Sequence, residues 1–201
     1  MTTTKKAAQP SERRADLVRL AADLFAEKGF QATSVREIAK AAGILSGSLY
    51  HHFDSKESIG DEILREFIDD VLGAYREAVA GTDSPRVAIE RMVRSSTAAL
   101  SRHRAALTML QNDWAYINAL PRFAYLRTAM REIEQTWIGQ LEQGKRSGVF
   151  RADLDARLIY RLLRDILWIP TSWKQARGKS WSTDEIVNGL LRLLFVGISA
   201  P

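Results

Sequence analysis

The chain of 201 residues contains no cysteine and three histidines. Without cysteine it forms no disulfide, thiolate nucleophile or thiolate metal site. His51 and His52 are adjacent, so on a helix their side chains point about 100° apart and do not bind one metal ion as an i, i+4 pair would. No nearby residue in the sequence suits His103 as a second metal ligand. We therefore expect no metal site and no cofactor.

The chain also lacks a long uninterrupted hydrophobic run. Arg192 interrupts the apolar passage 190–198, and no stretch reaches the roughly 18 residues of a membrane span. Residues 1–10 are polar, include Lys5 and Lys6, and precede no apolar segment of the kind found in a secretory signal. We expect a soluble cytoplasmic protein with no membrane partner.

Features of enzymes are equally scarce. No glycine-rich phosphate loop follows a strand pattern, and the acidic pair Asp69-Asp70 suits a solvated helix face. An enzyme acting on acyl thioesters remains an alternative, and it would need Asp165 as its acid or base. We expect a binding protein rather than an enzyme.

Apolar residues recur at intervals of three and four along nearly the whole chain, which predicts an all-α fold. Helix starts are marked by three capping patterns, which are Ser34 with Glu37, Asp54 with Glu57, and Ser182 with Glu185. The predicted helices, about nine in all, span residues 11–28, 34–42, 46–53, 54–80, 85–102, 104–118, 121–146, 154–177 and 183–199.

The two short helices near residues 34–53 are too small to be stable alone, and this favours a helix-turn-helix packed on the first helix. The second helix of such a unit enters the major groove of DNA, where its exposed residues must be small or hydrogen-bonding. Leu49 and Phe53 are four apart and are expected to face the core. The residues that fit the exposed face are Ser46, Gly47, Ser48, Tyr50 and His51.

These residues resemble the TetR family of DNA-binding regulators. The resemblance is carried by Thr33-Ser34-Val35-Arg36-Glu37-Ile38-Ala39, Ala42-Gly43-Ile44 and Gly47-Ser48-Leu49-Tyr50-His51-His52-Phe53-Asp54-Ser55-Lys56-Glu57. It covers about residues 11–60. It implies a three-helix DNA-binding domain at 11–55, preceded by a flexible basic arm at 1–10 and followed by a ligand-binding and dimerisation domain at 56–199. The basic arm has an alternative interpretation as a solubilising tail.

The resemblance also implies DNA contacts. Ser46, Gly47, Ser48 and Tyr50 would touch bases or nearby phosphates, and Thr33, His51 and Lys56 would hold the DNA backbone. Ser34 is expected at the same interface. Leu45 departs from the family, which often has a polar cap at this turn position. A helical hairpin with solvated surface residues is the alternative.

The helix predicted at 154–177 has a wide apolar arc and, opposite it, Arg157, Arg161 and Arg164 with Trp168 on the same side. Such a face suits an anion attached to a bulky apolar group. A solvated basic face with Trp168 packed on arginine stems is the alternative. Trp114 and Tyr125 are the aromatic candidates for the wall of a ligand cavity.

A narrower resemblance joins Asp165-Ile166-Leu167-Trp168, the preceding Arg161 and Arg164, and the stretch 49–57 to actinobacterial TetR-type repressors of steroid degradation. Those regulators respond to CoA thioesters of steroid fragments. The resemblance implies a small-molecule effector of this class, with the arginines serving the CoA phosphates.

The last helix carries an apolar band too wide for one core face, which predicts a homodimer interface. A dimer would read both halves of a palindromic double-stranded operator, and the effector would release it. One alternative is a C-terminal helix packed within its own domain. Another alternative is a helical carrier of acyl-CoA or lipid without DNA binding. A regulator whose effector strengthens DNA binding is a variant of the predicted repressor.

Overall fold

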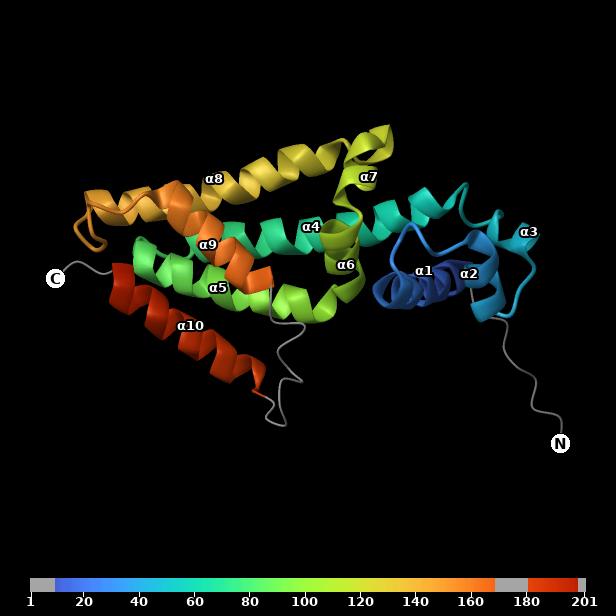
Figure 1. Cartoon of the computed structure of the whole chain (residues 1–201), viewed down its shortest axis with the longest axis horizontal. Coiled ribbons are helices and arrows are strands. Elements are labelled where there is room, and N and C mark those ends of the chain that lie inside the picture. Colours follow the sequence, from blue (N-terminus) through green and yellow to red (C-terminus); the bar gives the residue numbers. More distant parts are fainter. Residues whose placement is uncertain (1–9, 169–180, 199–201) are drawn as a thin grey trace. The chain divides into compact units, whose positions relative to one another are not determined.

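A computed structural model describes residues 10–168 and 181–198, without the side chains of residues 10, 11 and 168. The predicted basic arm and residues 169–177 of the predicted penultimate helix lie outside the described residues. Within residues 10–168 and 181–198 the regular elements are α-helices and one 3-10 helix (Figure 1), and this confirms the all-α prediction. The elements are α1 (Pro10–Lys28), α2 (Val35–Ala41), α3 (Ser46–Leu49), α4 (Lys56–Ala80), α5 (Pro85–Arg102), α6 (Arg104–Asn112), α7 (Trp114–Ala119), η1 (Pro121–Phe123), α8 (Tyr125–Arg146), α9 (Ala156–Trp168) and α10 (Thr183–Ile198).

The chain forms two compact units. The first contains residues 1–66 and 103–124, and the second contains residues 67–102 and 125–201. This division differs from the functional domains expected at 11–55 and 56–199, because α6, α7 and η1 belong with the N-terminal helices. The functional division itself remains a prediction.

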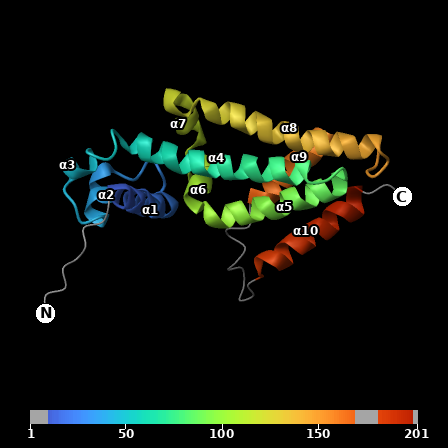
Figure 2. The ribbon, with the colours of Figure 1, turned by 180° about the vertical axis from the view of Figure 1, so that it is seen from behind.

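The first unit is built around α1, which packs on α2 and α6. Both ribbon views show α2 between α1 and α3 (Figure 1, Figure 2), and α2 contacts both of them. Its core is aromatic: Phe25 and Phe30 meet edge to face with ring centroids 4.9 Å apart, and Phe123 meets Phe30 in the same manner at 6.4 Å. All three rings are fully buried, and each contributes on the order of 2–3 kcal/mol through removal of its apolar surface from water.

The second unit is centred on α5, which contacts α8, α9 and α10. Trp137 of α8 is buried against Tyr75 of α4, with ring centroids 5.8 Å apart. Gly144 lets the chain after α8 fold back closely, because a Cβ there would lie 2.0 Å from the ring of Phe150. Within the described ranges, no helix has the length and apolar character to cross a membrane.

Several predicted boundaries are wrong. The helix predicted at 46–53 ends at Leu49 and continues as turns. The cap of α4 is Ser55 rather than Asp54, since Ser55 and Ser58 exchange side-chain and backbone hydrogen bonds. The predicted helix 104–118 is broken at Asp113. The helix predicted from 121 begins as a 3-10 turn, and α8 proper starts at residue 125.

Candidate functional site

The start of α2 is fixed by the capping box that the sequence predicts. Ser34 Oγ accepts a hydrogen bond from the backbone N–H of Glu37 at 3.3 Å, and the Glu37 carboxylate accepts one from the N–H of Ser34 at 2.9 Å. Lys28 at the end of α1 donates to the other carboxylate oxygen at 2.8 Å. This ammonium and the Ser34 donors hold the pKa of Glu37 at about 2. Two backbone groups at the helix start are thus satisfied by side chains.

The turn between α2 and α3 depends on glycine. Gly43 has φ +65°, a conformation that a side chain disfavours. The Gly43 N–H donates to Lys40 O at 3.1 Å, and the Ile44 N–H donates to Ala39 O at 3.0 Å. These two bonds form a Schellman motif, which ends α2 and sends the chain directly into α3.

The residues predicted to contact DNA lie on the short helix α3 and on the turns after it. Leu49 and Phe53 are 1% and 3% exposed, so the prediction that they anchor this segment is confirmed. Arg14 of α1 lies over the Phe53 ring, 4.4 Å from its centroid, and forms an ion pair with Glu62. The opposite side faces solvent: Gly47, Tyr50 and His51 are exposed, and Ser46 and Ser48 are half-buried.

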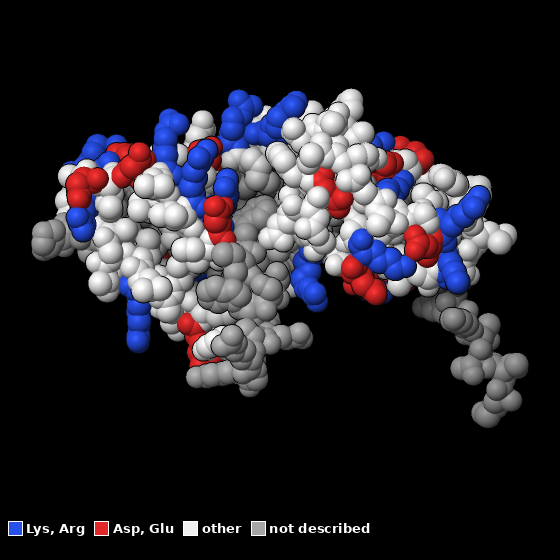
Figure 3. All heavy atoms as spheres, in the orientation of Figure 1, with Lys and Arg blue, Asp and Glu red and all other residues white. Residues whose placement is uncertain are grey.

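Leu45 precedes this helix and is 80% exposed. It occupies the N-cap position of α3 and makes no side-chain cap hydrogen bond. The departure from a polar cap thus leaves the start of α3 without one side-chain acceptor. Figure 3 shows basic and acidic side chains together on the viewed face of the first unit, so this face has no uniform positive charge.

Two residues expected at the DNA backbone make hydrogen bonds within the protein. Thr33 is 1% exposed, and its hydroxyl donates to Gly29 O at 2.8 Å, so a contact of Thr33 with the DNA backbone stays a prediction that this hydroxyl does not support. Lys56 Nζ donates to Phe30 O at 2.8 Å and to Gln31 O at 3.2 Å. Partial burial lowers the pKa of Lys56. A phosphate contact by Lys56 stays a prediction that would need a further donor hydrogen of the same ammonium.

The second unit contains a cavity of about 50 Å³. Its apolar wall includes Phe67, Val71, Leu100, Met130, Ile133 and Leu167. Tyr75 and Ser96 supply a buried polar pair in the wall, with Oη and Oγ 2.6 Å apart. Since the Ser96 hydroxyl donates to Met92 O at 2.7 Å, its single hydrogen is in use and Tyr75 must be the donor to Ser96.

Ionisable groups line the same cavity. Arg164 contributes to its wall, and its Nε and Nη2 donate to the neighbouring Asp165 carboxylate at 2.9 Å and 2.8 Å. Burial raises the pKa of Tyr160 to about 12 and also raises that of Tyr75. Both phenols are therefore neutral hydrogen-bonding groups at pH 7.

The predicted ligand residues are only partly brought together. Arg164 lines the cavity, whereas Arg161 is exposed elsewhere on α9. The side chain of Trp168 lies outside the described residues. The described residues that line this cavity include neither Trp114, which begins α7 in the first unit, nor Tyr125, which begins α8. A role of those two residues in ligand binding stays a prediction.

Sequence reasoning missed the Tyr75–Ser96 pair as a candidate ligand contact. A signal was present: Tyr75 continues the i, i+4 apolar row of Phe67 and Val71, and Ser96 lies between Met92 and Leu100 in the same spacing. A hydroxyl within an apolar helical row indicates a buried group that needs a partner.

A second apolar surface lies on α9 and α10. Large side chains remain solvent-exposed along both helices, with exposed fractions of 55% for Leu158, 51% for Leu162, 41% for Ile166, 78% for Leu193 and 86% for Val196. Leu162, Ile166 and Leu193 line a groove of about 580 Å³ between the two helices, whereas Leu158 lies outside it and Val196 lines a neighbouring groove with residues of α5. We call the five side chains the α9/α10 apolar face. Large apolar side chains left exposed in such a group mark a protein–protein contact.

Comparison with known proteins agrees with this geometry. Residues 17–63 match the family described as bacterial regulatory proteins, tetR family, and residues 82–198 match the tetracyclin repressor-like C-terminal domain. The HTH-type transcriptional repressor KstR2 of Rhodococcus jostii (strain RHA1) is 44% identical over 191 residues, which are 95% of this chain and 93% of that protein.

Solved structures extend the similarity to the fold. The structure of the ketosteroid transcriptional regulator KstR2 of Mycobacterium tuberculosis superposes with a TM-score of 0.88 at 38% identity, covering 97% of this chain and 99% of that one. AibR in complex with isovaleryl coenzyme A and operator DNA has the same fold at 19% identity, with a TM-score of 0.80 and coverage of 91% and 98%. The protein described here belongs to the TetR family of bacterial regulatory proteins.

Proposed function

We propose that this protein is a transcriptional repressor that binds a palindromic operator as a homodimer and is released by a small-molecule effector. The observation that carries the proposal is the exposed side of α3 and its following turns, held on the buried anchors Leu49 and Phe53. Small and hydrogen-bonding groups there allow the backbone to approach base edges in a major groove. The 44% identical relative is named as a repressor, which supports repression. Such a regulator acts on chromosomal DNA in the cytoplasm.

The homodimer forms through the α9/α10 apolar face. A two-fold dimer presents two copies of α3, and half-sites separated by about 34–36 Å or a multiple then set the operator's symmetry. One copy of so short a helix offers few base contacts, so affinity depends on both half-sites being read together.

The effector we propose is a CoA thioester of a steroid fragment. The M. tuberculosis relative is a ketosteroid transcriptional regulator, and AibR, which has the same fold, binds isovaleryl coenzyme A and operator DNA. In this chain the apolar cavity wall suits a ring system, and the Tyr75–Ser96 pair, whose two hydroxyl hydrogens are already in use, offers oxygen lone pairs that can accept from a ring hydroxyl. Arg164 and Arg161 on α9 suit the anionic part of the ligand.

The cavity is too small for such a ligand as it stands. A volume of about 50 Å³ holds a few water molecules, whereas pockets for ligands of this size occupy roughly 300–1,000 Å³. Effector binding must therefore displace the surrounding helices. Because α4 lines the cavity through Phe67, Val71 and Tyr75 and continues to Lys56, the displaced helix is covalently continuous with the DNA-binding residues. An effector that favours the opened form lowers the population that fits DNA.

The test is protection of genomic DNA fragments by the purified protein over a salt series, with and without synthetic steroid-fragment CoA thioesters. We expect salt-sensitive protection of a palindrome that a thioester abolishes, since phosphate contacts release counterions. Thioester binding without any sequence-specific protection would instead favour a carrier. Stronger protection in the presence of thioester would mean that the effector strengthens DNA binding instead of releasing it.

A further inference from the structure

The chain passes between the two compact units three times, at residues 66/67, 102/103 and 124/125. The first passage is inside α4. The other two enclose the segment 103–124, which contains α6, α7 and η1 and whose ends continue into α5 and α8 of the second unit. Any influence of the second unit on the DNA-binding helices that travels along the chain therefore runs through α4 or through this segment.

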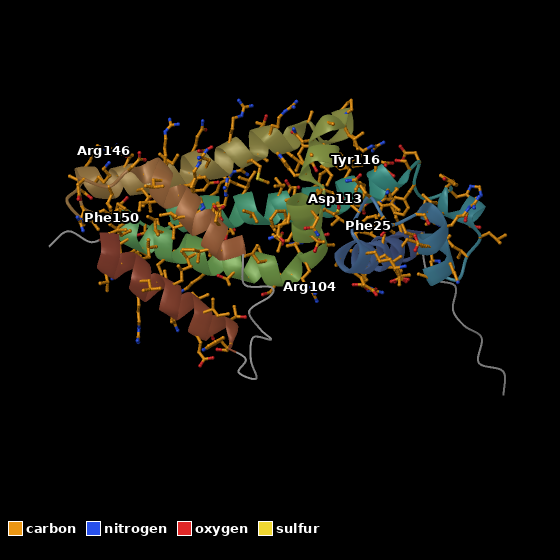
Figure 4. All side chains as sticks on the ribbon, in the orientation of Figure 1. Phe25, Arg104, Asp113, Tyr116, Arg146 and Phe150 are labelled. Atoms are coloured by element: carbon orange, nitrogen blue, oxygen red, sulfur yellow. The ribbon has the colours of Figure 1, made fainter. Side chains whose placement is uncertain are left out.

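The segment 103–124 is bonded to the N-terminal part of the first unit at the break between α6 and α7. Asp113 at this break is 7% exposed. Its Oδ2 accepts a hydrogen bond from the backbone N–H of Phe30 at 3.0 Å, and its Oδ1 accepts one from Gln31 Nε2 at 3.0 Å. Figure 4 labels Asp113 with Tyr116 and Phe25 in this region. Phe30 and Gln31 form part of the connection from α1 to α2, four and three residues before the Ser34 cap.

The same two residues are held from another element. Lys56, the first residue of α4, donates to the carbonyl oxygens of both Phe30 and Gln31, and its Nζ lies 4.8 Å from the centroid of the Phe30 ring. The backbone N–H of Phe30 thus donates to Asp113 at the α6–α7 break, and the carbonyl groups of Phe30 and Gln31 accept from the Lys56 ammonium at the start of α4. The negative charge of Asp113 also opposes the lowering of the Lys56 pKa by burial.

Further contacts surround this point. Tyr116 donates to Glu57 at 3.2 Å, and Arg122 donates to Asp54 at 2.8 Å. Packing is close: a Cβ on Gly60 would lie 2.8 Å from the Phe30 ring and 3.0 Å from Met109 Cε. The absence of free space limits how far the Phe30 connection can shift while its bonds remain intact.

We propose that Asp113 is a positioning residue for operator recognition: by holding the Phe30–Gln31 connection it sets the helix-turn-helix in the orientation that reads DNA. The inference rests on the proposed repressor function. A buried carboxyl group needs hydrogen-bond partners. Both oxygens of Asp113 have one, from the Phe30 N–H and from Gln31 Nε2, and two directional bonds restrict geometry more strongly than an apolar contact would.

The experiment compares Asp113→Ala, Asp113→Asn and the wild type. The probe is a fluorescent duplex that the wild-type protein selects from a random-sequence library, with a scrambled duplex for non-specific affinity. We expect Asp113→Ala to weaken specific binding about ten-fold and to change non-specific binding less than two-fold, since the phosphate-facing charges are unaltered. Asp113→Asn should restore most of the specific affinity, because the amide oxygen accepts from Phe30 N–H and the amide group donates to a flipped Gln31.

Asp23→Ala is the matched control, because it removes the same charge from an exposed position of α1; its specific affinity should stay within two-fold of wild type. The fraction of protein that binds duplex is measured separately, with duplex in excess. This distinguishes a loss of folded molecules from a change in the affinity of each molecule. Hydrogen exchange at the Phe30 amide should accelerate in Asp113→Ala and not in Asp23→Ala.

An unchanged ratio of specific to non-specific affinity in Asp113→Ala overturns the inference. If that variant does not fold, Gln31→Ala decides, because it deletes one bond from an exposed side chain: a loss of two-fold or more in specific affinity supports the inference, and no loss overturns it. If the wild-type protein selects no duplex at all, the repressor function fails, and the positioning role falls with it.

Discussion

Buried polar side chains in this protein fix turns of the main chain. Thr33 bonds to Gly29 O, and Asp113 bonds to the N–H of Phe30. In each case a short polar side chain satisfies a backbone group that packing alone would leave without a partner. The residue type at these positions reports on the fold, even where it lies within a DNA-binding motif.

Thr33→Val tests this interpretation. Valine has nearly the same shape but cannot donate to Gly29 O, so we expect the free energy of unfolding to fall by about 1 kcal/mol. The measurement is urea denaturation. The dependence of operator affinity on salt should be unchanged, because no phosphate contact is lost. A salt slope reduced by about one unit would instead place the hydroxyl at a phosphate.

Gly47→Ala separates stability from recognition. Nothing lies within 4 Å of a Cβ built on Gly47, and its φ is not positive. Alanine in a helix is more favourable than glycine by up to about 1 kcal/mol, so thermal unfolding should shift upward. Operator affinity should nevertheless fall, because the added methyl group projects from the exposed side that we expect to approach the bases. Equal or tighter operator binding would remove Gly47 from the interface.

At the scale of elements, local sequence signals were sufficient where the controlling contacts are local. The Ser34–Glu37 and Ser182–Glu185 capping boxes are both present, as is the Gly43 turn. The break at Asp113 was not predictable in this way, because its cause is a hydrogen bond to Phe30, 83 residues away. The early end of α3 likewise depends on how Leu49 and Phe53 pack rather than on a local stop signal.

The capping box of α2 should give a measurable pH dependence. The pKa of Glu37 is lowered to about 2 from 4.5, first by the Lys28 hydrogen bond and then by Ser34. A carboxyl group whose pKa is depressed in the folded state contributes stability that is present above pH 4.5 and is lost as the pH falls toward 2. Glu37→Gln retains a side-chain acceptor at this position but not the charge.

We therefore expect Glu37→Gln to lower the midpoint of thermal unfolding at pH 6, and the difference from wild type to shrink progressively from about pH 4.5 toward pH 2. Circular dichroism melts over this range provide the measurement. Lys28→Met should reduce the same pH dependence, because it removes the largest cause of the shift. A difference that stays constant with pH would mean that Glu37 titrates normally.

At the scale of the molecule, the all-α class and the helix-turn-helix followed from periodicity and from a family resemblance. The division into two compact units could not be predicted from the sequence, because residues 103–124 join the N-terminal helices through contacts that no local pattern encodes. The candidate effector site was only half predicted: Arg164 lines the cavity, but its polar wall comes from Tyr75 and Ser96 on helices whose apolar rows look like ordinary core.

The dimer gives the remaining prediction, because a repressor that reads two half-sites needs two protomers. Leu193 is 78% exposed in the single chain, so Leu193→Glu costs the protomer little, but it places a charge in the contact made by the α9/α10 apolar face. Sedimentation should show monomers at micromolar concentration, and operator affinity should fall at least ten-fold as the second half-site is lost. Val87→Glu introduces the same charge on α5, outside this face, and should remain dimeric. If Leu193→Glu also remains dimeric with full operator affinity, the two protomers meet through another surface and the α9/α10 apolar face must be covered by a different partner.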